Sequence, residues 1–305
     1  MKPLVIYHDN CADGFGAAFA AWLKLGDEAE YLPMQYGAEA QLQLLALRPS
    51  LEARDVYILD FSFEKPVMEQ VFSCAKRVVW LDHHKTAFEM WVGEIPEGGS
   101  WYEDANFMRG QHVICLDSNK SGALLAWEFF HPGTKVPLLF QHIDDRDRWQ
   151  FKLKGSKEVN AYLMSVKPWK FQDWQNSILG TEYIRTYYQG DAILRAQKAI
   201  VRALVKKAQK CELFYQSDLN MVSARDGLAV NSPTYQSEIG HELVNVSGTF
   251  GLVWFWNAEE HKVNCSLRSN GDYDVSAIAK AFGGGGHKNA AGFSCSMDQL
   301  IGWLR

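Results

Sequence analysis

The sequence predicts an α/β protein of two domains, and three observations support this prediction. The chain has 305 residues, whereas one hydrophobic core ordinarily serves roughly 100–200 residues, so two domains are expected. Hydrophobic residues make up 47% of the chain and charged residues 22%, which is the composition of a globular protein. In the first half of the chain, short apolar runs alternate with helical stretches, a pattern typical of a parallel sheet covered on both faces.

The elements of the first domain follow from these apolar runs. Continuous runs of about four apolar residues suit strands that are buried on both sides. The expected strands are residues 4–7, 56–59, 78–81, 112–116 and 138–143. Residues 14–25, which are rich in alanine and glycine, and residues 122–130 are expected helices. Together these elements predict a parallel-sheet domain over residues 1–190.

A long helix is expected from about residue 181 to 211. Its apolar residues recur on one face at helical spacing: Ile193, Ile200, Val201, Leu204 and Ala208. Its cationic side has no acidic neighbour between 192 and 211: Arg195, Lys198, Arg202, Lys206, Lys207 and Lys210. Such a helix is most simply a solvated connection between domains, and attraction of an anionic substrate is the alternative. We therefore expect a helical linker over residues 191–212.

The second domain is expected over residues 213–305, where strand patterns dominate. Residues 251–256 and 262–267 predict a hairpin, and residues 275–282 predict an amphipathic helix that four glycines follow. This smaller domain is therefore also of the α/β class.

Charge, hydropathy and cysteine content exclude several classes of protein. Lys and Arg number 31 and Asp and Glu 36, giving a net charge of −5, which argues against a protein that coats long nucleic acid but allows a small anionic substrate. No run of about 18 apolar residues predicts a membrane span, and the first ten residues do not resemble a signal peptide. The six cysteines are scattered without a C-x-x-C pair, which favours reduced thiols in a cytoplasmic protein.

Acidic and histidine side chains follow the predicted strands where those strands end. They are His8, Asp60, the triplet Asp82-His83-His84, and the pair Asp144-Asp145 after residues 138–143. The carboxyl ends of parallel strands bind ligands, and clustered anions repel one another unless a cation lies among them. A single Asp after a strand is usually a helix cap, but four such ends together predict divalent metal. The count suits two ions, and mixed histidine and carboxylate ligands favour Mn²⁺, Fe²⁺, Co²⁺ or Zn²⁺ over Ca²⁺.

A glycine run near the end of the chain is the second candidate site. Residues 283–286 are four glycines that precede His287, and consecutive glycines let backbone N–H groups approach an anion. The small residues that follow would let a helix start against that anion; a flexible loop is the alternative. Arg268, at the end of a predicted strand, could bind phosphate with two parallel hydrogen bonds. Ser121-Gly122 precedes a helix, as a cap or a further anion site.

Taken in order, these residues resemble the DHH phosphoesterase superfamily, and most closely its DHH–DHHA1 subfamily, which includes oligoribonucleases that degrade very short RNA. The matching positions are His8, Asp13-Gly14, Asp60, Asp82-His83-His84 and the segment 284–292 (GGGHKNAAG). The resemblance extends from residue 4 to 294. It implies a parallel-sheet DHH domain, a smaller DHHA1 domain, a cleft between them, and a two-metal centre on the larger domain, typically with Mn²⁺.

The resemblance also implies roles for single residues. The implied ligands of one metal ion are His8 and Asp60. Those of the other are Asp13, Asp60, His83 and one acid of the Asp144-Asp145 pair, of which Asp145 fits the family's spacing better. Asp60 would bridge the ions and His84 would contact the scissile phosphate, so the expected catalytic residues are Asp60, His83 and His84. The expected substrate-phosphate residues of the second domain are Arg268, Gly284, Gly285, Gly286 and His287.

One position departs from the family's first motif, which has an aspartate where this chain has Cys11. A thiolate binds Mn²⁺, Fe²⁺, Co²⁺ and Zn²⁺ but favours the softer and later metals. Cys11 is therefore a candidate metal ligand. The alternatives are that Asp9 takes its place or that the thiol has no role.

The expected function is that of a metal-dependent phosphodiesterase that hydrolyses short oligonucleotides or linear or cyclic dinucleotides, with a water activated by two metal ions. Mn²⁺ is the expected metal, with Co²⁺, Fe²⁺ and Zn²⁺ as alternatives. Trp149, Trp169 and Trp174 are candidates for stacking on bases, and core packing is the alternative that explains most aromatic residues. A polyphosphate or pyrophosphate hydrolase and a non-catalytic nucleotide-binding protein are the competing interpretations. The expected partner is a short nucleotide or other phosphate compound, not long nucleic acid or a membrane, and a homodimer is compatible with the sequence.

Overall fold

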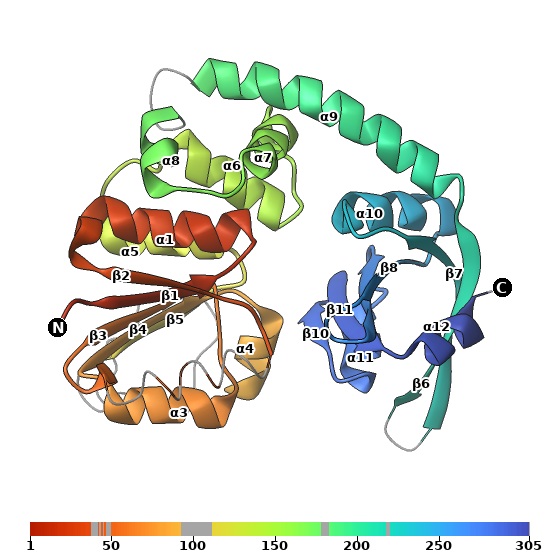
Figure 1. Cartoon of the computed structure of the whole chain (residues 1–305), viewed down its shortest axis with the longest axis horizontal. Helices are drawn as coiled ribbons and strands as arrows, with labels where there is room; N and C mark the ends of the chain where they lie inside the picture. The colour runs from red at the N-terminus through yellow and green to blue at the C-terminus, as the bar shows by residue number, and fades with distance from the viewer. Residues whose placement is uncertain are drawn as a thin grey trace. The chain divides into compact units, whose positions relative to one another are not determined.

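The structure is a computed structural model, and it describes residues 1–37, 42, 44, 46, 50–92, 112–177, 183–217 and 220–304 (Figure 1). The chain divides into two compact units, Met1–Leu194 and Arg195–Arg305. Each unit has its own β-sheet and its own hydrophobic core. The prediction of an α/β protein with two domains of this class is confirmed.

The first unit contains a parallel sheet with the strand order β2-β1-β3-β4-β5. Its strands are β1 (Leu4–His8), β2 (Glu30–Met34), β3 (Asp55–Leu59), β4 (Arg77–Asp82) and β5 (Val113–Leu116). Four of them confirm the strands predicted at 4–7, 56–59, 78–81 and 112–116. The sequence does not predict β2, because this edge strand contains Pro33 and buries only Met34.

Helices cover both faces of this sheet, which explains why its strands are apolar throughout (Figure 1). On one face, α1 (Ala12–Leu25) and α5 (Gly122–Phe130) share a core with Val5. On the other, α3 (Lys65–Cys74) and α4 (Lys85–Met90) share a core with Ile6. Neighbouring residues of β1 therefore enter different cores. The two predicted helices are confirmed, and a short 3₁₀ turn, η1 (Gly26–Glu28), follows α1.

Three further helices complete the first unit: α6 (Leu138–Asp147), α7 (Ser156–Ser165) and α8 (Phe171–Ser177). The predicted strand over 138–143 is wrong, since these residues form the first turns of α6. A short apolar run fits a strand and a buried helix equally well by periodicity, and Pro137, at the start of α6, is compatible with the beginning of a helix. The acidic residues that follow therefore lie in the last turns of a helix.

The second unit contains a sheet with the order β10-β11-β9-β8-β7-β6, in which β7 and β8 are parallel and the other neighbours antiparallel. Its strands are β6 (Gln209–Ser217), β7 (Asn220–Asn231), β8 (Phe250–Asn257), β9 (Lys262–Ser269), β10 (Gly285–His287) and β11 (Ala290–Cys295). Its helices include α10 (Gln236–Ser247), α11 (Val275–Ala281) and α12 (Met297–Trp303). The hairpin β8–β9 and the helix α11 confirm the elements predicted there.

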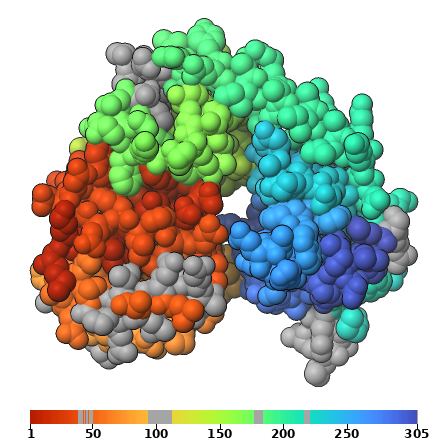
Figure 2. Space-filling model, viewed as in Figure 1, coloured from red at the N-terminus to blue at the C-terminus, as the bar shows by residue number. Residues whose placement is uncertain are grey.

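The longest helix, α9 (Tyr183–Val205), runs from the first unit into the second. The prediction of a helix as far as residue 211 is wrong, because β6 begins at Gln209, and residues 181–182 lie outside the described residues. Cys211 and Leu213 are buried two residues apart, which is the spacing of a strand. The cations of this stretch are exposed, and Figure 2 shows α9, in green, at the surface. Neither α9 nor any other described helix is both long and apolar enough to cross a membrane.

The glycine run forms a tight hairpin of β10 and β11, so the prediction that a helix starts there is wrong. A Cβ atom at Gly284 would lie 2.1 Å from the carbonyl oxygen of Gly292. At Gly286, which has a φ of 136°, it would lie 2.5 Å from the carbonyl oxygen of Ala290. Glycine is needed here because two backbones approach closely and one residue has a conformation that side chains disfavour.

Candidate metal centre

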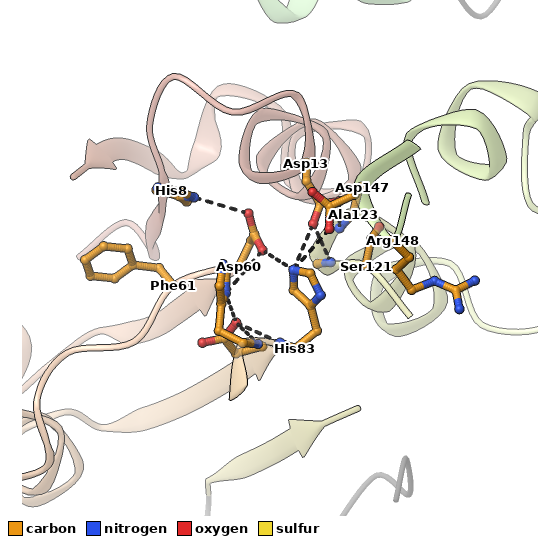
Figure 3. Close-up of polar contacts among 12 residues, drawn as sticks. His8, Asp13, Asp60, Phe61, His83, Ser121, Ala123, Asp147 and Arg148 are labelled. Carbon is orange, nitrogen blue, oxygen red and sulfur yellow. Dashed lines mark hydrogen bonds and ion pairs between the residues drawn. The ribbon is translucent and has the colours of Figure 1, made fainter. Parts of the chain in front are cut away.

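The ends of β1, β3 and β4 bring histidine and carboxylate side chains to one edge of the parallel sheet (Figure 3). His8 ends β1, Asp60 follows β3, and Asp82 ends β4 with His83 and His84 directly after it. Asp60 lies between two histidines, since its Oδ2 is 3.7 Å from His8 Nδ1 and its Oδ1 is 3.1 Å from His83 Nε2. The three strand ends therefore converge on one carboxylate.

Asp60 has the burial, the backbone conformation and the unpaired oxygens that are typical of a ligand-binding residue. It is 1% exposed, and its φ of 53° is a left-handed conformation that aspartate tolerates better than most residues. Neither of its carboxylate oxygens has a hydrogen-bond donor, and the buried Nδ1 of His8 also has no hydrogen-bond partner. Buried polar atoms nearly always have partners. These unpaired oxygen and nitrogen atoms therefore fit a bound cation.

A first group of side chains around Asp60 has ligand atoms close enough to hold a metal ion. His8, Cys11 and Asp60 each offer one ligand atom, and these atoms lie within 4.8 Å of one another. Cys11 lies between β1 and α1, at the N-cap position of α1. Asp9 joins no such group among the described residues, and its Oδ2 accepts a hydrogen bond from Gln35 at 3.3 Å. The geometry thus favours Cys11 over Asp9.

A second group consists of Asp13, His83 and Asp147, again within 4.8 Å. Nε2 of His83 is 3.4 Å from Asp13 and 3.5 Å from Asp147 (Figure 3). Asp13 is fixed by the N-terminus of α5, where the backbone N–H groups of Gly122 and Ala123 donate to its carboxylate at 2.7 and 2.9 Å. The positive end of the helix dipole stabilises this buried carboxylate. Asp13 therefore connects α1, α5 and the cluster.

Asp147, and not the predicted Asp145, lies beside Asp13 and His83 in this group. The carboxylate of Asp145 accepts hydrogen bonds from the backbone N–H groups of Lys152 and Leu153, at 2.8 and 3.0 Å, and from the Ser156 hydroxyl. Asp145 and Asp144 belong to no metal-binding group among the described residues. The structure thus corrects the preference for Asp145. Helical spacing is the signal that could have found Asp147, because in a helix it shares a face with the buried residues 143 and 144.

The remaining acid, Asp144, is also committed to a structural role. It accepts a hydrogen bond from the backbone N–H of Ser121 at 2.8 Å and forms a two-pronged ion pair with Arg148. Ser121 itself caps α5, since its hydroxyl accepts from the backbone N–H of Leu124. These contacts attach α6 to the start of α5, and so place Asp147 near Asp13.

His84 is oriented by Asp82, which is fully buried. Nδ1 of His84 lies 2.7 Å from Oδ1 of Asp82, and the same oxygen accepts from the backbone N–H of His83 at 2.7 Å. The other oxygen of Asp82 accepts from the hydroxyl of Ser62. A carboxylate on one ring nitrogen fixes the tautomer of the imidazole. Asp82 therefore fixes the orientation of the His84 ring, whose Nδ1 lies 3.9 Å from Oδ1 of Asp60.

Opposing effects set the protonation of the cluster when no cation is bound. Burial and the nearby Asp60 raise the pKa of Asp13 well above its usual value. Burial alone would also raise the pKa of Asp60, but the neighbouring imidazoles of His8 and His83 outweigh it and hold this pKa far below its usual value. Burial disfavours the charged form of His83, yet Asp60 and Asp147 raise its pKa well above 6.5. The metal-free cluster therefore binds protons in place of a cation.

The three tryptophans that were candidates for stacking on bases lie in packed surroundings. Trp174 is 1% exposed within the core of the first unit, so core packing, the alternative to stacking, holds for this residue. Trp169 packs on Phe15 at 5.4 Å, and its Nε1 donates to the carbonyl of Leu163 at 2.6 Å. The ring of Trp149 is covered by the guanidinium of Arg146 at 4.4 Å. The packing of Trp169 and Trp149 offers no support for their predicted role.

The predicted phosphate-binding residues of the second unit lie on adjacent strands. Ala290 of β11 is opposite Arg268 of β9 on one side and opposite His287 of β10 on the other. Directly opposed residues share a face of a sheet, so Arg268 and His287 flank the small Ala290 on one face. Arg268 donates to the hydroxyl of Ser237 at 2.7 Å. The glycines 284–286 allow β10 to approach β11 closely enough for this arrangement.

Comparison with known proteins identifies the family. Residues 242–301 match the DHHA1 domain. The chain is 30% identical over 304 residues to the uncharacterized protein R106 of Acanthamoeba polyphaga mimivirus, which covers 96% of this chain and 67% of that protein. It is 24% identical over 306 residues to oligoribonuclease NrnB of Bacillus subtilis, with 95% and 72% covered. The chain belongs to the DHH–DHHA1 phosphoesterases.

A DHH–DHHA1 phosphoesterase is a hydrolase that acts on phosphoesters, so the predicted enzyme class is confirmed. The match to DHHA1 lies within residues 213–305, where the sequence predicts that domain. Among solved structures the chain is similar to the pGpG-specific phosphodiesterase PggH of Vibrio cholerae, with a TM-score of 0.45 and 11% identity over 98% of this chain and 95% of that one.

Replacing Gly122 by alanine should weaken metal binding. The added Cβ would lie 2.4 Å from Cβ of Asp60 and 2.7 Å from its Oδ1, so the Asp60 carboxylate must move. We expect the Kd for Mn²⁺, measured by calorimetry, to rise roughly 10- to 100-fold. As a control, Ser296→Ala removes the N-cap of α12 in the second unit at a cost of about 1 kcal/mol of stability and should leave this Kd unchanged. An equal loss in both variants would contradict the role given to Gly122.

Substitution of the two neighbouring aspartates should separate a metal ligand from a structural carboxylate. Asp147→Asn should raise the Kd for Mn²⁺ at least about tenfold, with little change in the stability of the metal-free protein. Asp145→Asn, which weakens the hydrogen bonds to Lys152, Leu153 and Ser156, should instead lower the free energy of unfolding by about 2 kcal/mol and leave the Kd near that of the wild type. Calorimetry and urea denaturation check both; the reverse pattern would restore Asp145 as the ligand.

The metal-free protein should lose stability as the pH rises above 6.5. The pKa values of His8 and His83 are raised above 6.5 in the folded protein. Their protonation therefore contributes stability that is complete below that pH and is lost as the pH rises through the folded pKa values. Asp13, whose pKa is also raised, acts in the same direction. Because a bound cation replaces these protons, the increase in Tm on adding Mn²⁺ should grow with pH; a constant increase would contradict this.

Proposed function

We propose that this protein hydrolyses the phosphodiester bonds of short oligonucleotides or of linear or cyclic dinucleotides, with two divalent metal ions held around Asp60. The observation that carries the proposal is the buried carboxylate of Asp60, which lacks hydrogen-bond donors. It belongs to the ligand group of His8 and Cys11, and its Oδ1 lies 3.1 Å from Nε2 of His83, which belongs to the group of Asp13 and Asp147. A carboxylate in that position is suited to bridge two ions. The similarity to an oligoribonuclease supports the choice of substrate.

The residues of the first unit supply ligands and orientation. Two divalent ions, when bound, would lower the pKa of a water molecule and neutralise charge on the phosphoryl oxygens. We assign His8, Cys11 and Asp60 to one ion, and Asp60 with the group Asp13, His83 and Asp147 to the other. His84, whose Nδ1 is engaged by Asp82, would contact the substrate phosphate with its other ring nitrogen.

The residues of the second unit would bind a phosphate group of the substrate. Arg268 and His287 share one face of the second sheet, on either side of Ala290. A guanidinium and an imidazole so placed can bind one phosphate group together. Gly284, Gly285 and Gly286 would add backbone N–H groups without side chains in the way.

The donor set decides which metals suit the centre. Histidine and carboxylate ligands fit Mn²⁺, Co²⁺, Fe²⁺ and Zn²⁺, and the thiol of Cys11 shifts the preference toward the later metals. We take Mn²⁺ as the first ion to test, because carboxylates outnumber the thiol in the two groups.

The test is hydrolysis with added Mn²⁺ of a dinucleotide, a cyclic dinucleotide, a 20-mer RNA and polyphosphate. We expect turnover of the dinucleotide or cyclic dinucleotide and little of the other two. Asp60→Asn is the matched blank, because asparagine tolerates the left-handed backbone while losing the charge; its turnover should fall at least about 100-fold. Hydrolysis of polyphosphate alone would replace this proposal by a phosphoanhydride hydrolase. Metal binding without any turnover would indicate a nucleotide-binding protein.

A further inference from the structure

An aromatic side chain that the sequence analysis did not single out lies beside the candidate metal ligands. Tyr36 follows β2, and its ring meets the ring of His8 edge to face at 5.1 Å and that of His84 at 5.9 Å. It is 48% exposed, which is unusual for a large aromatic residue next to a buried cluster. A large exposed ring at this position can contact whatever the cluster binds.

The ring of Tyr36 is held in place by Phe61 and by a hydrogen bond between its hydroxyl and the backbone of Ser62. It stacks on Phe61 with the ring centroids 4.6 Å apart and the planes 22° from parallel. Phe61 is 1% exposed and in turn packs edge to face on Phe63 at 4.9 Å. Figure 3 shows the ring of Phe61 beside His8. Tyr36 is therefore the outermost of a series of packed rings, and a ring fixed in this way loses little conformational entropy when it binds a planar group.

We propose that Tyr36 stacks on the nucleobase next to the scissile phosphate and so gives the centre its preference for nucleotides. The inference rests on the proposed function for the identity of the ligand. A phosphate bound at His84, beside the ion that His8 would hold, would have its neighbouring nucleoside within reach of a ring 5–6 Å from both imidazoles. Stacking on an aromatic side chain suits a nuclease of low sequence preference, since every base has a π-face.

Tyr36 could instead act only by supporting His8 through their edge-to-face contact. The two roles predict different results when the base is removed from the ligand. A support for His8 would affect all phosphate ligands equally, whereas a stacking residue would affect only those that carry a base.

The experiment compares binding of AMP and of ribose 5-phosphate to the Mn²⁺-loaded protein by calorimetry, since neither contains a phosphodiester. In the wild type we expect AMP to bind roughly 5- to 150-fold more tightly than ribose 5-phosphate. Tyr36→Leu, which keeps an apolar side chain against Phe61, should abolish this difference, while Tyr36→Phe should retain it. The Kd of both variants for Mn²⁺ should stay within about twofold of the wild type, which verifies that the metal groups are intact.

Two results would overturn the stacking role: an equal loss of AMP and ribose 5-phosphate affinity in Tyr36→Leu, or no change in either. The proposed function is judged separately, by dinucleotide turnover in the wild type. A base preference that depends on Tyr36 in a protein without turnover would retain the stacking role and reject the phosphodiesterase. Turnover with a base preference that does not depend on Tyr36 would retain the phosphodiesterase and reject the stacking role of Tyr36.

Discussion

The first unit depends on how it accommodates one buried carboxylate, that of Asp60, which has no hydrogen-bond donor for either oxygen. A carboxylate without partners is costly to bury. His8 and His83 approach it from two sides, and Gly122 leaves the room it occupies. In the metal-free protein the neighbouring Asp60 and Asp147 raise the pKa of His83, which favours a proton on this imidazole as the missing positive charge. Metal ions would supply this positive charge in the loaded protein. Neutralising the Asp60 carboxylate therefore matters both for the stability of the first unit and for the proposed chemistry.

The parallel sheet is what made much of this centre predictable. Strands buried on both faces have continuous apolar sequences, so the sequence indicates where each strand ends. Because neighbouring parallel strands end at the same edge of the sheet, the residues at those ends were expected to lie close together. The structure brings together His8, Asp60 and the triplet 82–84. Asp13 also lies in the cluster, although its attachment to the N-terminus of α5 involves residues 109 and 110 positions away. A tertiary contact of that kind leaves no local pattern.

Elsewhere the local pattern allowed two structures, and the tertiary surroundings decided between them. The apolar run at 138–143 fits a strand or a helix, and in α6 it is Asp147, not Asp145, that lies in a group of candidate metal ligands. The glycine run suggested a helix start, whereas the carbonyl oxygens of Gly292 and Ala290 require glycine for the approach of two strands. Trp149, Trp169 and Trp174 were candidates for stacking on bases, but large aromatic residues mostly lie in the core, as Trp174 does.

Cys11 gives the two proposed metal-binding groups different chemistry. The group of His8, Cys11 and Asp60 offers an imidazole, a thiol and a carboxylate, while the group around His83 offers one imidazole and two carboxylates. Burial and the neighbouring Asp60 raise the pKa of the Cys11 thiol, so a cation that binds this sulfur must displace a proton, which an aspartate at the same place would not require. Thiolate also favours later metals. The two groups are therefore expected to differ in metal preference and in the pH dependence of binding, and an ion that fills the oxygen-rich group need not fill the other.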